Sequence, residues 1–155
     1  FIPSEPGKFL DLGCGYGAIG IVLSYESPES LVYLVDLNKR AIWCAKENAR
    51  LNLMNKGKNL IILSGNYFEP IKHKNLLFDE IYMNPPLRQG RKEFLNLFPT
   101  IHNYLNSHGS FQFVIKKKMG APYIYDYLKN KFPNSPVEII CKRSGYWVFR
   151  FFHEN

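Results

Sequence analysis

The residues Asn84-Pro85-Pro86-Leu87 follow an apolar run, Phe78 to Met83, that is typical of a buried strand. Proline has no backbone N–H, so two prolines in succession end the strand and leave its last carbonyls turned outward. The Asn84 side-chain oxygen and the Pro85 carbonyl can accept the two N–H bonds of a planar exocyclic amine and direct its lone pair. These four residues are our candidate catalytic residues, with Asn84 positioning the amine rather than deprotonating it. An ordinary asparagine turn before prolines is the alternative.

A glycine-rich segment, Asp11 to Gly17, follows the first predicted strand and opens the first predicted helix. Glycines at such a turn let a ligand approach the backbone, which indicates a nucleotide-like cofactor. A nicotinamide dinucleotide is one candidate, because the segment also satisfies GxGxxG formally. Its pyrophosphate would lie at the helix start, where Asp11 tends to repel it. S-Adenosylmethionine carries an ammonium and a sulfonium instead, and Asp11 would attract both, directly or through water.

Further cofactor contacts are expected where the second and third predicted strands end. Asp36 lies about twenty residues past the glycines, where an acid can accept both ribose hydroxyls. Capping of the next helix is the other interpretation of Asp36. Asn66 lies where a side chain can meet the adenine amine, although an ordinary turn explains it equally well. The candidate cofactor-binding residues are Asp11, Gly13, Cys14, Gly15, Gly17, Asp36, Leu37, Asn66, Tyr67 and Asn84.

Apolar runs alternate with segments of helical period and predict a Rossmann-like α/β fold with helices on both faces of a mostly parallel sheet. Strands are predicted over 8–12, 31–35, 59–63, 78–83 and 110–115, and helices over 18–25, 39–53, 91–105 and 121–132. Two last strands, 137–141 and 146–152, flank Ser144-Gly145 and predict a hairpin that adds one antiparallel strand. Ligands bind beyond the carboxyl ends of strands in such sheets, where all the candidate residues lie.

The 155 residues, 46% of them apolar, are expected to form one domain over 1–155. A net charge of +7 favours RNA or DNA as a partner, although a merely soluble basic protein is equally compatible with it. Three widely spaced cysteines fit neither a disulfide framework nor a zinc site, and no histidine has a partner at metal-ligand spacing. We expect a soluble, cytoplasmic protein without a metal. The chain does not begin with methionine, and its first predicted strand follows shortly after its first residue. We therefore expect that an N-terminal segment is missing.

Two basic clusters are predicted at one edge of the sheet. Arg88, Arg91 and Lys92 follow the Asn-Pro-Pro turn, and the lysines of 116–118 follow the fifth strand. Phosphates of a nucleic acid could bind there, beside the amine site. Other basic pairs lie on helices or turns and are interpreted as solvated surface. The candidate substrate-binding residues are Asn84, Arg88, Gly90 and Lys116.

With these motifs placed, the sequence resembles the class I S-adenosylmethionine-dependent methyltransferases through DLGCGYG at 11–17, Asp36 and NPPL at 84–87. Segments 84–90, 113–121 and 144–148 resemble the RsmC-like enzymes that methylate guanine N2 in small-subunit ribosomal RNA. The resemblance implies a seven-stranded sheet with a reversed last strand, S-adenosylmethionine as cofactor, and ribosomal RNA or the small subunit as partner. It also implies that Asn84 and Pro85 bind the amine. At the position of Asn66, many members of the family carry an aspartate instead.

Three other functions stay open at this stage. Methyltransferases of protein glutamine or adenine N6 share the NPP turn but usually carry an aromatic residue at the Leu87 position. An RNA-binding module with a methyltransferase fold and no turnover would fit a missing N-terminal part. A nicotinamide dehydrogenase is disfavoured by Asp11 and by the double proline, which hydride transfer does not require.

Overall fold

The structure is a computed structural model that describes residues 3, 5–54, 57–87 and 90–153. The strands are β1 (Lys8–Leu12), β2 (Leu31–Asp36), β3 (Leu60–Ser64), β4 (Phe78–Met83), β5 (Leu105–Lys116), β6 (Val137–Arg143) and β7 (Tyr146–Phe152). The helices are α1 (Ala18–Glu26), α2 (Lys39–Leu53), α3 (Lys92–Leu95), α4 (Phe98–His102) and α5 (Ala121–Lys131). Short 3₁₀ turns are η1 (Gly57–Asn59), η2 (Glu69–Ile71) and η4 (Lys117–Met119).

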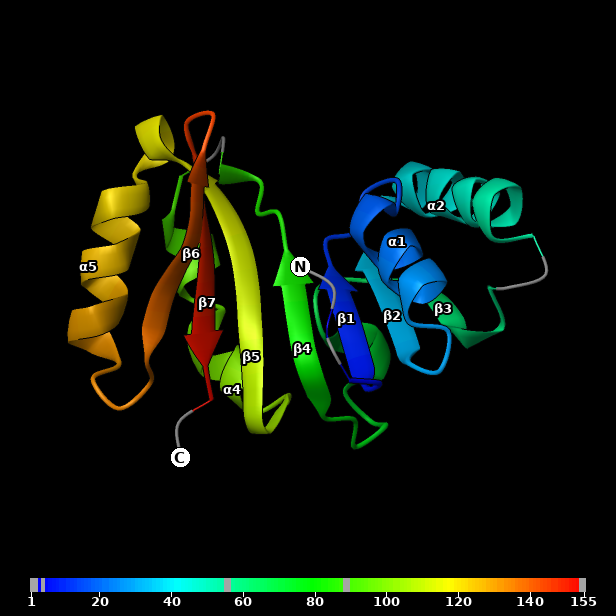
Figure 1. Cartoon of the computed structure of the whole chain (residues 1–155), viewed down its shortest axis with the longest axis horizontal. Helices are drawn as coiled ribbons and strands as arrows, with labels where there is room; N and C mark the ends of the chain where they lie inside the picture. The colour runs from blue at the N-terminus through cyan, green and yellow to red at the C-terminus, as the bar shows by residue number, and fades with distance from the viewer. Residues whose placement is uncertain (1–2, 4, 55–56, 88–89, 154–155) are drawn as a thin grey trace.

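The strands form one seven-stranded sheet in the order β3-β2-β1-β4-β5-β7-β6 (Figure 1). Neighbouring pairs from β3 to β5 are parallel. Strand β7 lies between β5 and β6 and is antiparallel to both. The predicted Rossmann-like fold, mostly parallel with one reversed strand in a C-terminal hairpin, is therefore confirmed.

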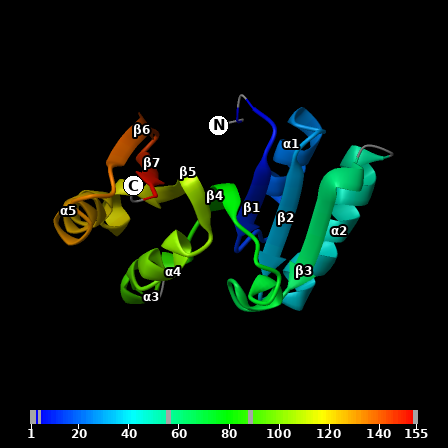
Figure 2. The same ribbon diagram turned by 90° about the horizontal axis from the view of Figure 1, so that it is seen from below.

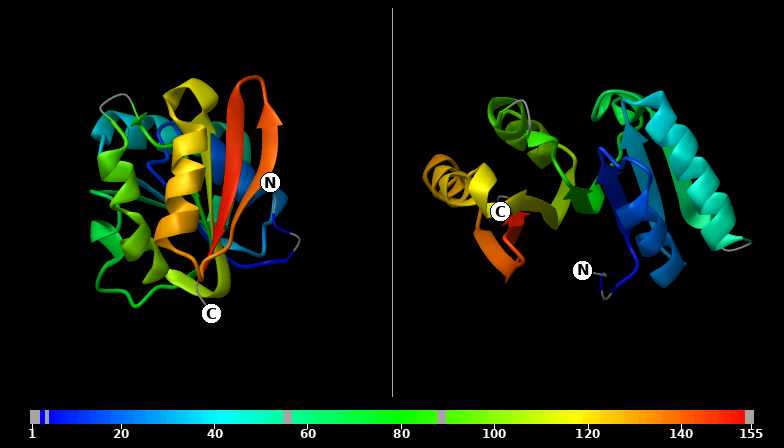
Figure 3. Two further views of the ribbon diagram at one scale, coloured as in Figure 1. Left: turned by 90° about the vertical axis from the view of Figure 1, so that its left-hand side faces the viewer. Right: turned by 90° about the horizontal axis from the view of Figure 1, so that it is seen from above.

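Helices cover both faces of the sheet (Figure 2). Helices α1 and α2 lie over β1, β2 and β3, whereas α3, α4 and α5 lie on the opposite face (Figure 3). On the first face, a Cβ on Gly20 would overlap the side chain of Leu34, so α1 lies unusually close to β2. This close packing holds the start of α1 beside the ends of β1 and β2. No helix in the described ranges is long and apolar enough to cross a membrane.

The larger core on the second face is built from phenylalanines. The ring of Phe98 meets Phe113 and Phe151 edge to face, with centroids 5.6 and 5.0 Å away, and Phe94 meets Phe113 at 5.2 Å. Edge-to-face contacts of this kind add to the free energy gained from apolar burial. The cluster fixes α3 and α4, which follow the Asn-Pro-Pro turn, against β5 and β7.

The predicted continuous helix over 91–105 is wrong. The chain forms the two short helices α3 and α4 there, and β5 already begins at Leu105. Pro99 lies in the first turn of α4, where its missing N–H is tolerated, so a new helix starts instead of the old one continuing. Phe94, Phe98 and Ile101 keep helical spacing and are all buried, which explains the sequence pattern.

Replacing Phe98 with alanine should lower the free energy of unfolding by about 3–5 kcal/mol, because it leaves a cavity among the phenylalanines. Leu51→Ala is the control, since Leu51 on α2 is 60% exposed and its loss should change stability by less than about 0.5 kcal/mol. Urea denaturation followed by circular dichroism measures both. Equal losses for the two variants would contradict this description of the core.

Candidate active site

The glycine loop after β1 folds against the end of β2. The N–H groups of Gly13 and Cys14 both donate to the Val35 carbonyl, at 2.8 and 3.0 Å. Gly13, Gly15 and Gly17 have φ angles of 71°, 58° and 89°, in the left-handed region that favours glycine. A Cβ added to Gly15 would meet no atom within 4 Å. The loop therefore exposes backbone beside open space, as close approach of a ligand requires.

Asp36 is held in place at the end of β2 by two backbone groups. Its Oδ2 accepts from the Gly15 N–H at 2.8 Å and its Oδ1 accepts from the Asn38 N–H at 2.7 Å. Asn38, not Asp36, caps α2, because its Oδ1 accepts from the Arg40 N–H at 2.9 Å. The carboxylate is half-buried, and each oxygen keeps a lone pair for the hydroxyl groups of a ligand. Leu37 is exposed beside it.

Asp11 is buried, with 1% of its surface exposed, and its Oδ2 accepts from the Gly20 N–H at 2.9 Å. Desolvation raises the pKa of Asp11 to about 7; the Gly20 N–H opposes this shift and the Asp36 carboxylate adds to it. The carboxyl group therefore joins β1 to α1 from inside the fold. Desolvation, with smaller contributions from the same two carboxylates, also raises the pKa of the Cys14 thiol to about 12, so this thiol stays protonated.

The loop after β3 reaches across to α3. Asn66 is exposed, and its backbone carbonyl accepts from the Glu69 N–H at 2.9 Å. Tyr67 has a φ of 45°, which is uncommon for a bulky residue, and its hydroxyl donates to Glu93 Oε1 at 2.9 Å. Partial burial and then the Glu93 carboxylate raise the pKa of Tyr67 to about 12. Tyr67 thus connects the loop expected to bind adenine with the helix that follows the Asn-Pro-Pro turn.

The Asn-Pro-Pro turn alternates between exposed and buried residues. Asn84 and Pro86 are exposed, whereas Pro85 and Leu87 are buried. The Leu87 N–H donates to the Pro85 carbonyl at 3.0 Å, so one lone pair of that carbonyl remains for a ligand. Leu87 is 8% exposed and packs in the main core, so it anchors the turn from inside. Within the described residues, no hydrogen bond engages the Asn84 side chain.

The glycine loop and the Asn-Pro-Pro turn leave adjacent strands at the same edge of the sheet. Strands β1 and β4 pair in parallel, with Asp11 opposite Tyr82. A Cβ on Gly13 would lie 3.9 Å from the end of the Met83 side chain. Adjacent strands are about 4.8 Å apart, so the Gly13 backbone and Asn84 are close neighbours. The structure therefore brings the two predicted sites together.

The two basic clusters also come to this edge. The Arg91 guanidinium lies 4.4 Å from the centroid of the Tyr123 ring and packs on Gly120, where a Cβ would overlap it. Lys116 Nζ lies 5.1 Å from the centroid of the Tyr146 ring. Arg91 thereby joins the segment after β4 to the start of α5.

Of the remaining candidate substrate residues, Gly90 is exposed with a φ of 110°, and its N–H donates to the Leu87 carbonyl at 3.1 Å. Arg88 lies outside the described residues. Sequence reasoning did not single out Glu93 or Tyr123, and it included Tyr146 only as part of segment 144–148, with no role of its own. No group of three or more His, Cys, Asp and Glu side chains is arranged to hold a metal in the ranges that the structure covers.

Comparison with known proteins gives one family. Residues 2–150 match the family model of the methyltransferase small domain. The uncharacterized protein YbxB of Bacillus subtilis is 32% identical over 148 residues, which are 96% of this chain and 71% of that protein. Ribosomal RNA small subunit methyltransferase C of Buchnera aphidicola is 29% identical over 152 residues. These matches confirm the resemblance drawn from the DLGCGYG and NPPL motifs.

A solved structure of similar fold is the T. thermophilus 16S rRNA N2 methyltransferase RsmC in complex with AdoMet and guanosine. It superposes with a TM-score of 0.76 at 20% identity, over 98% of this chain and 38% of that one. The match to the Buchnera relative covers 96% of this chain but only 41% of that relative. The present chain thus corresponds to less than half of these two proteins.

The buried carboxyl of Asp11 should make stability depend on pH. Its folded-state pKa of about 7 exceeds the ordinary value of 3.8, so between these values the folded state holds a proton that the unfolded chain releases. The free energy of unfolding should therefore fall as pH rises from about 4 to about 7, by at most about 4 kcal/mol. Asp11→Asn keeps the shape but does not titrate. Urea denaturation between pH 4.5 and 7.5 measures the free energy of unfolding of the wild type and of Asp11→Asn. The contributions of other titrating groups cancel in the difference between the two values. A constant difference would show that Asp11 has an ordinary pKa.

Proposed function

The chain belongs to the methyltransferase small domain family, and on this premise we propose that it methylates the exocyclic N2 amine of a guanine in small-subunit ribosomal RNA, using S-adenosylmethionine. One observation carries the proposal: the glycine loop and the Asn84-Pro85 turn leave the adjacent strands β1 and β4 at the same edge. A cofactor bound on the loop would lie beside an amine bound at the turn. The names of the Buchnera relative and of the similar RsmC structure support the choice of substrate.

The described residues fit S-adenosylmethionine. The space beside Gly15 is open, and the Asp36 carboxylate next to it is already oriented to accept ribose hydroxyls. Asp11 would favour the cofactor's two cations through space, since its carboxyl is buried behind the loop. Asn66 is exposed in the loop after β3 and could accept from the adenine amine. When bound, S-adenosylmethionine supplies an electrophilic methyl carbon on sulfonium.

The role of the turn is to align the amine. An amine that attacks a sulfonium-bound methyl would displace the neutral thioether, and the positive charge would pass from sulfur to nitrogen and leave as a proton to solvent. Because no new charge has to be created, the protein mainly orients the nucleophile and excludes water. The Asn84 side-chain oxygen and the remaining lone pair of the Pro85 carbonyl would accept the two N–H bonds of guanine N2. Burial of Pro85 and Leu87 keeps these acceptors fixed. Asn84 therefore positions the amine without acting as a base.

The choice of guanine and RNA rests on the surroundings of the turn. Leu87 occupies the position where enzymes for glutamine or adenine N6 usually carry an aromatic residue, and its side chain is packed in the core. The basic residues Arg91, Lys92 and Lys116 would neutralise phosphates around the entrance. That residues 1–155 form one domain and that the protein is cytoplasmic stay predictions.

Asn84→Ala should reduce methyl transfer to small-subunit ribosomal RNA by about 100-fold or more, because a misaligned nucleophile loses this much rate. The affinity for S-adenosylmethionine should fall much less than the rate, because Asn84 is only one of the ten candidate cofactor-binding residues. Transfer of a tritiated methyl group measures the rate, and nucleoside mass spectrometry should identify N2-methylguanosine. Asn130→Ala, an exposed amide on α5, is the matched control and should retain wild-type activity.

Retention of activity in Asn84→Ala would refute the role of the turn. Label found in protein alone, or in N6-methyladenosine, would replace the guanine assignment with one of the other substrates. Failure to bind S-adenosylmethionine while RNA binding persists would identify a binding module without turnover.

A further inference from the structure

The β6–β7 hairpin lies next to η4 at the edge of the sheet that carries the Asn84 turn (Figure 1). The Lys117 N–H donates to the Gly145 carbonyl at 2.7 Å, which fixes η4 against the hairpin tip. Together they line a surface cavity of 610 Å³, walled by the three lysines of 116–118, by Pro122 and by the tip from Ser144 to Tyr146. This cavity is separate from the glycine loop, and of its lining residues only Lys116 is among the candidate substrate-binding residues.

Tyr146, in the wall of this cavity, pairs with a basic residue on each neighbouring strand. The strand register places it opposite Lys116 of β5 on one side and opposite Arg143 of β6 on the other. Residues directly opposite each other project from the same face of a sheet, so Lys116 and Arg143 project from the same face as the Tyr146 ring. The Lys116 Nζ is 5.1 Å from the ring centroid, and 40% of Tyr146 is exposed.

The two chain segments that form this cavity carry charge of a single sign. Segments 116–122 and 141–148 contain the basic residues Lys116, Lys117, Lys118, Lys142 and Arg143 and no acidic residue. A solvated surface usually mixes both signs, whereas one sign concentrated in a cavity attracts a polyanion. An exposed aromatic ring among cations is the arrangement that binds unpaired nucleotides, because the base stacks on the ring and the phosphates meet the charges.

The cavity lies too far from Asn84 to hold the same base. Met83 pairs with Phe113, so Asn84 comes level with Val114, two residues before Lys116, and Tyr146 lies one strand further out. With strands about 4.8 Å apart and a rise of about 3.3 Å per residue, Tyr146 is about 12 Å from Asn84. A nucleotide bound at Tyr146 would therefore be a neighbour of the target.

We propose that this cavity is a subsite for an unpaired RNA nucleotide that flanks the methylated guanine. Its base stacks on Tyr146, and the adjoining phosphates bind Lys117 and Lys118. The inference rests on the proposed function for the identity of the polyanion as RNA. It adds that the substrate must be locally single-stranded, because a base within a duplex cannot stack on a side chain.

The test is binding of a fluorescein-labelled single-stranded oligoribonucleotide, followed by anisotropy without S-adenosylmethionine. Tyr146→Ala should weaken binding about tenfold, whereas Tyr146→Phe should keep the stacking and bind within about twofold of the wild type. The double variant Lys117→Gln with Lys118→Gln should lower the slope of log affinity against log salt by about 1.4, as expected for two lost phosphate contacts to a single strand.

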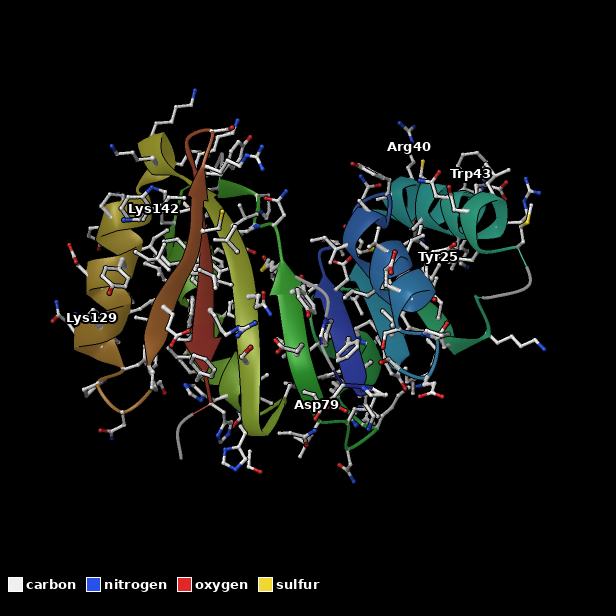
Figure 4. The ribbon with its side chains drawn as sticks, in the orientation of Figure 1. Tyr25, Arg40, Trp43, Asp79, Lys129 and Lys142 are labelled. Carbon is white, nitrogen blue, oxygen red and sulfur yellow. The ribbon has the colours of Figure 1, made fainter. Side chains whose placement is uncertain are left out.

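Two control variants match these changes elsewhere on the surface. Trp43→Ala removes a ring that is 66% exposed on α2, on the side of the molecule away from Lys142 of the hairpin (Figure 4). Lys72→Gln with Lys74→Gln removes two exposed lysines from the loop before β4, at the opposite ends of the parallel strands. Both should bind RNA within about twofold of the wild type.

Wild-type affinity in both Tyr146→Ala and the double lysine variant would overturn the subsite, as would tighter binding of blunt duplex RNA than of the single strand. The experiments distinguish a failure of the subsite from a failure of the proposed function. If no RNA is methylated but the hairpin variants still lose binding selectively, the subsite stands without the proposed function. If methylation occurs and the hairpin variants bind normally, the proposed function stands without the subsite.

Discussion

The parallel pairing of β1 with β2 and β4 is the constraint on which the site depends. Because the three strands run in the same direction, the glycine loop, Asp36 and Asn84 all leave the sheet at one edge. The strand register sets how far along the strand direction each of them lies. The Val35 carbonyl holds the loop by accepting from the N–H groups of Gly13 and Cys14. A slip of one residue in either pairing would turn each strand's side chains to the other face and separate the two halves of the site.

The site also carries a structural cost. Asp11 is a buried carboxyl whose raised pKa opposes ionisation, and its contact with the Gly20 N–H offsets only part of the desolvation. An apolar residue there would be easier to bury. An acid at this position is favourable if a cation binds at the loop, because the cation would stabilise the ionised carboxylate and offset part of its desolvation free energy. Tyr67 is a second such cost, because its backbone is strained. Its hydroxyl donates to Glu93 and so joins the cofactor side of the site to the substrate side.

Local sequence patterns were sufficient to predict the sheet, the glycine loop and the strand before Asn84, because apolar period and glycine or proline chemistry are local properties. The strand Phe78–Met83 and the helix Lys39–Leu53 agree to the residue. The break before Pro99 was missed because apolar spacing continues across it. Contacts such as Tyr67 with Glu93 or Lys116 with Tyr146 join residues far apart in the sequence, and no local pattern marks them.

The most direct test of the central claim is a crystal structure with S-adenosylhomocysteine and guanosine bound. Guanosine N2 should lie within about 3.2 Å of both the Asn84 side-chain oxygen and the Pro85 carbonyl oxygen, with the cofactor sulfur facing the nitrogen. A guanosine whose N2 points away from both acceptors, or a cofactor bound anywhere other than on the loop from Gly13 to Gly17, would contradict the account.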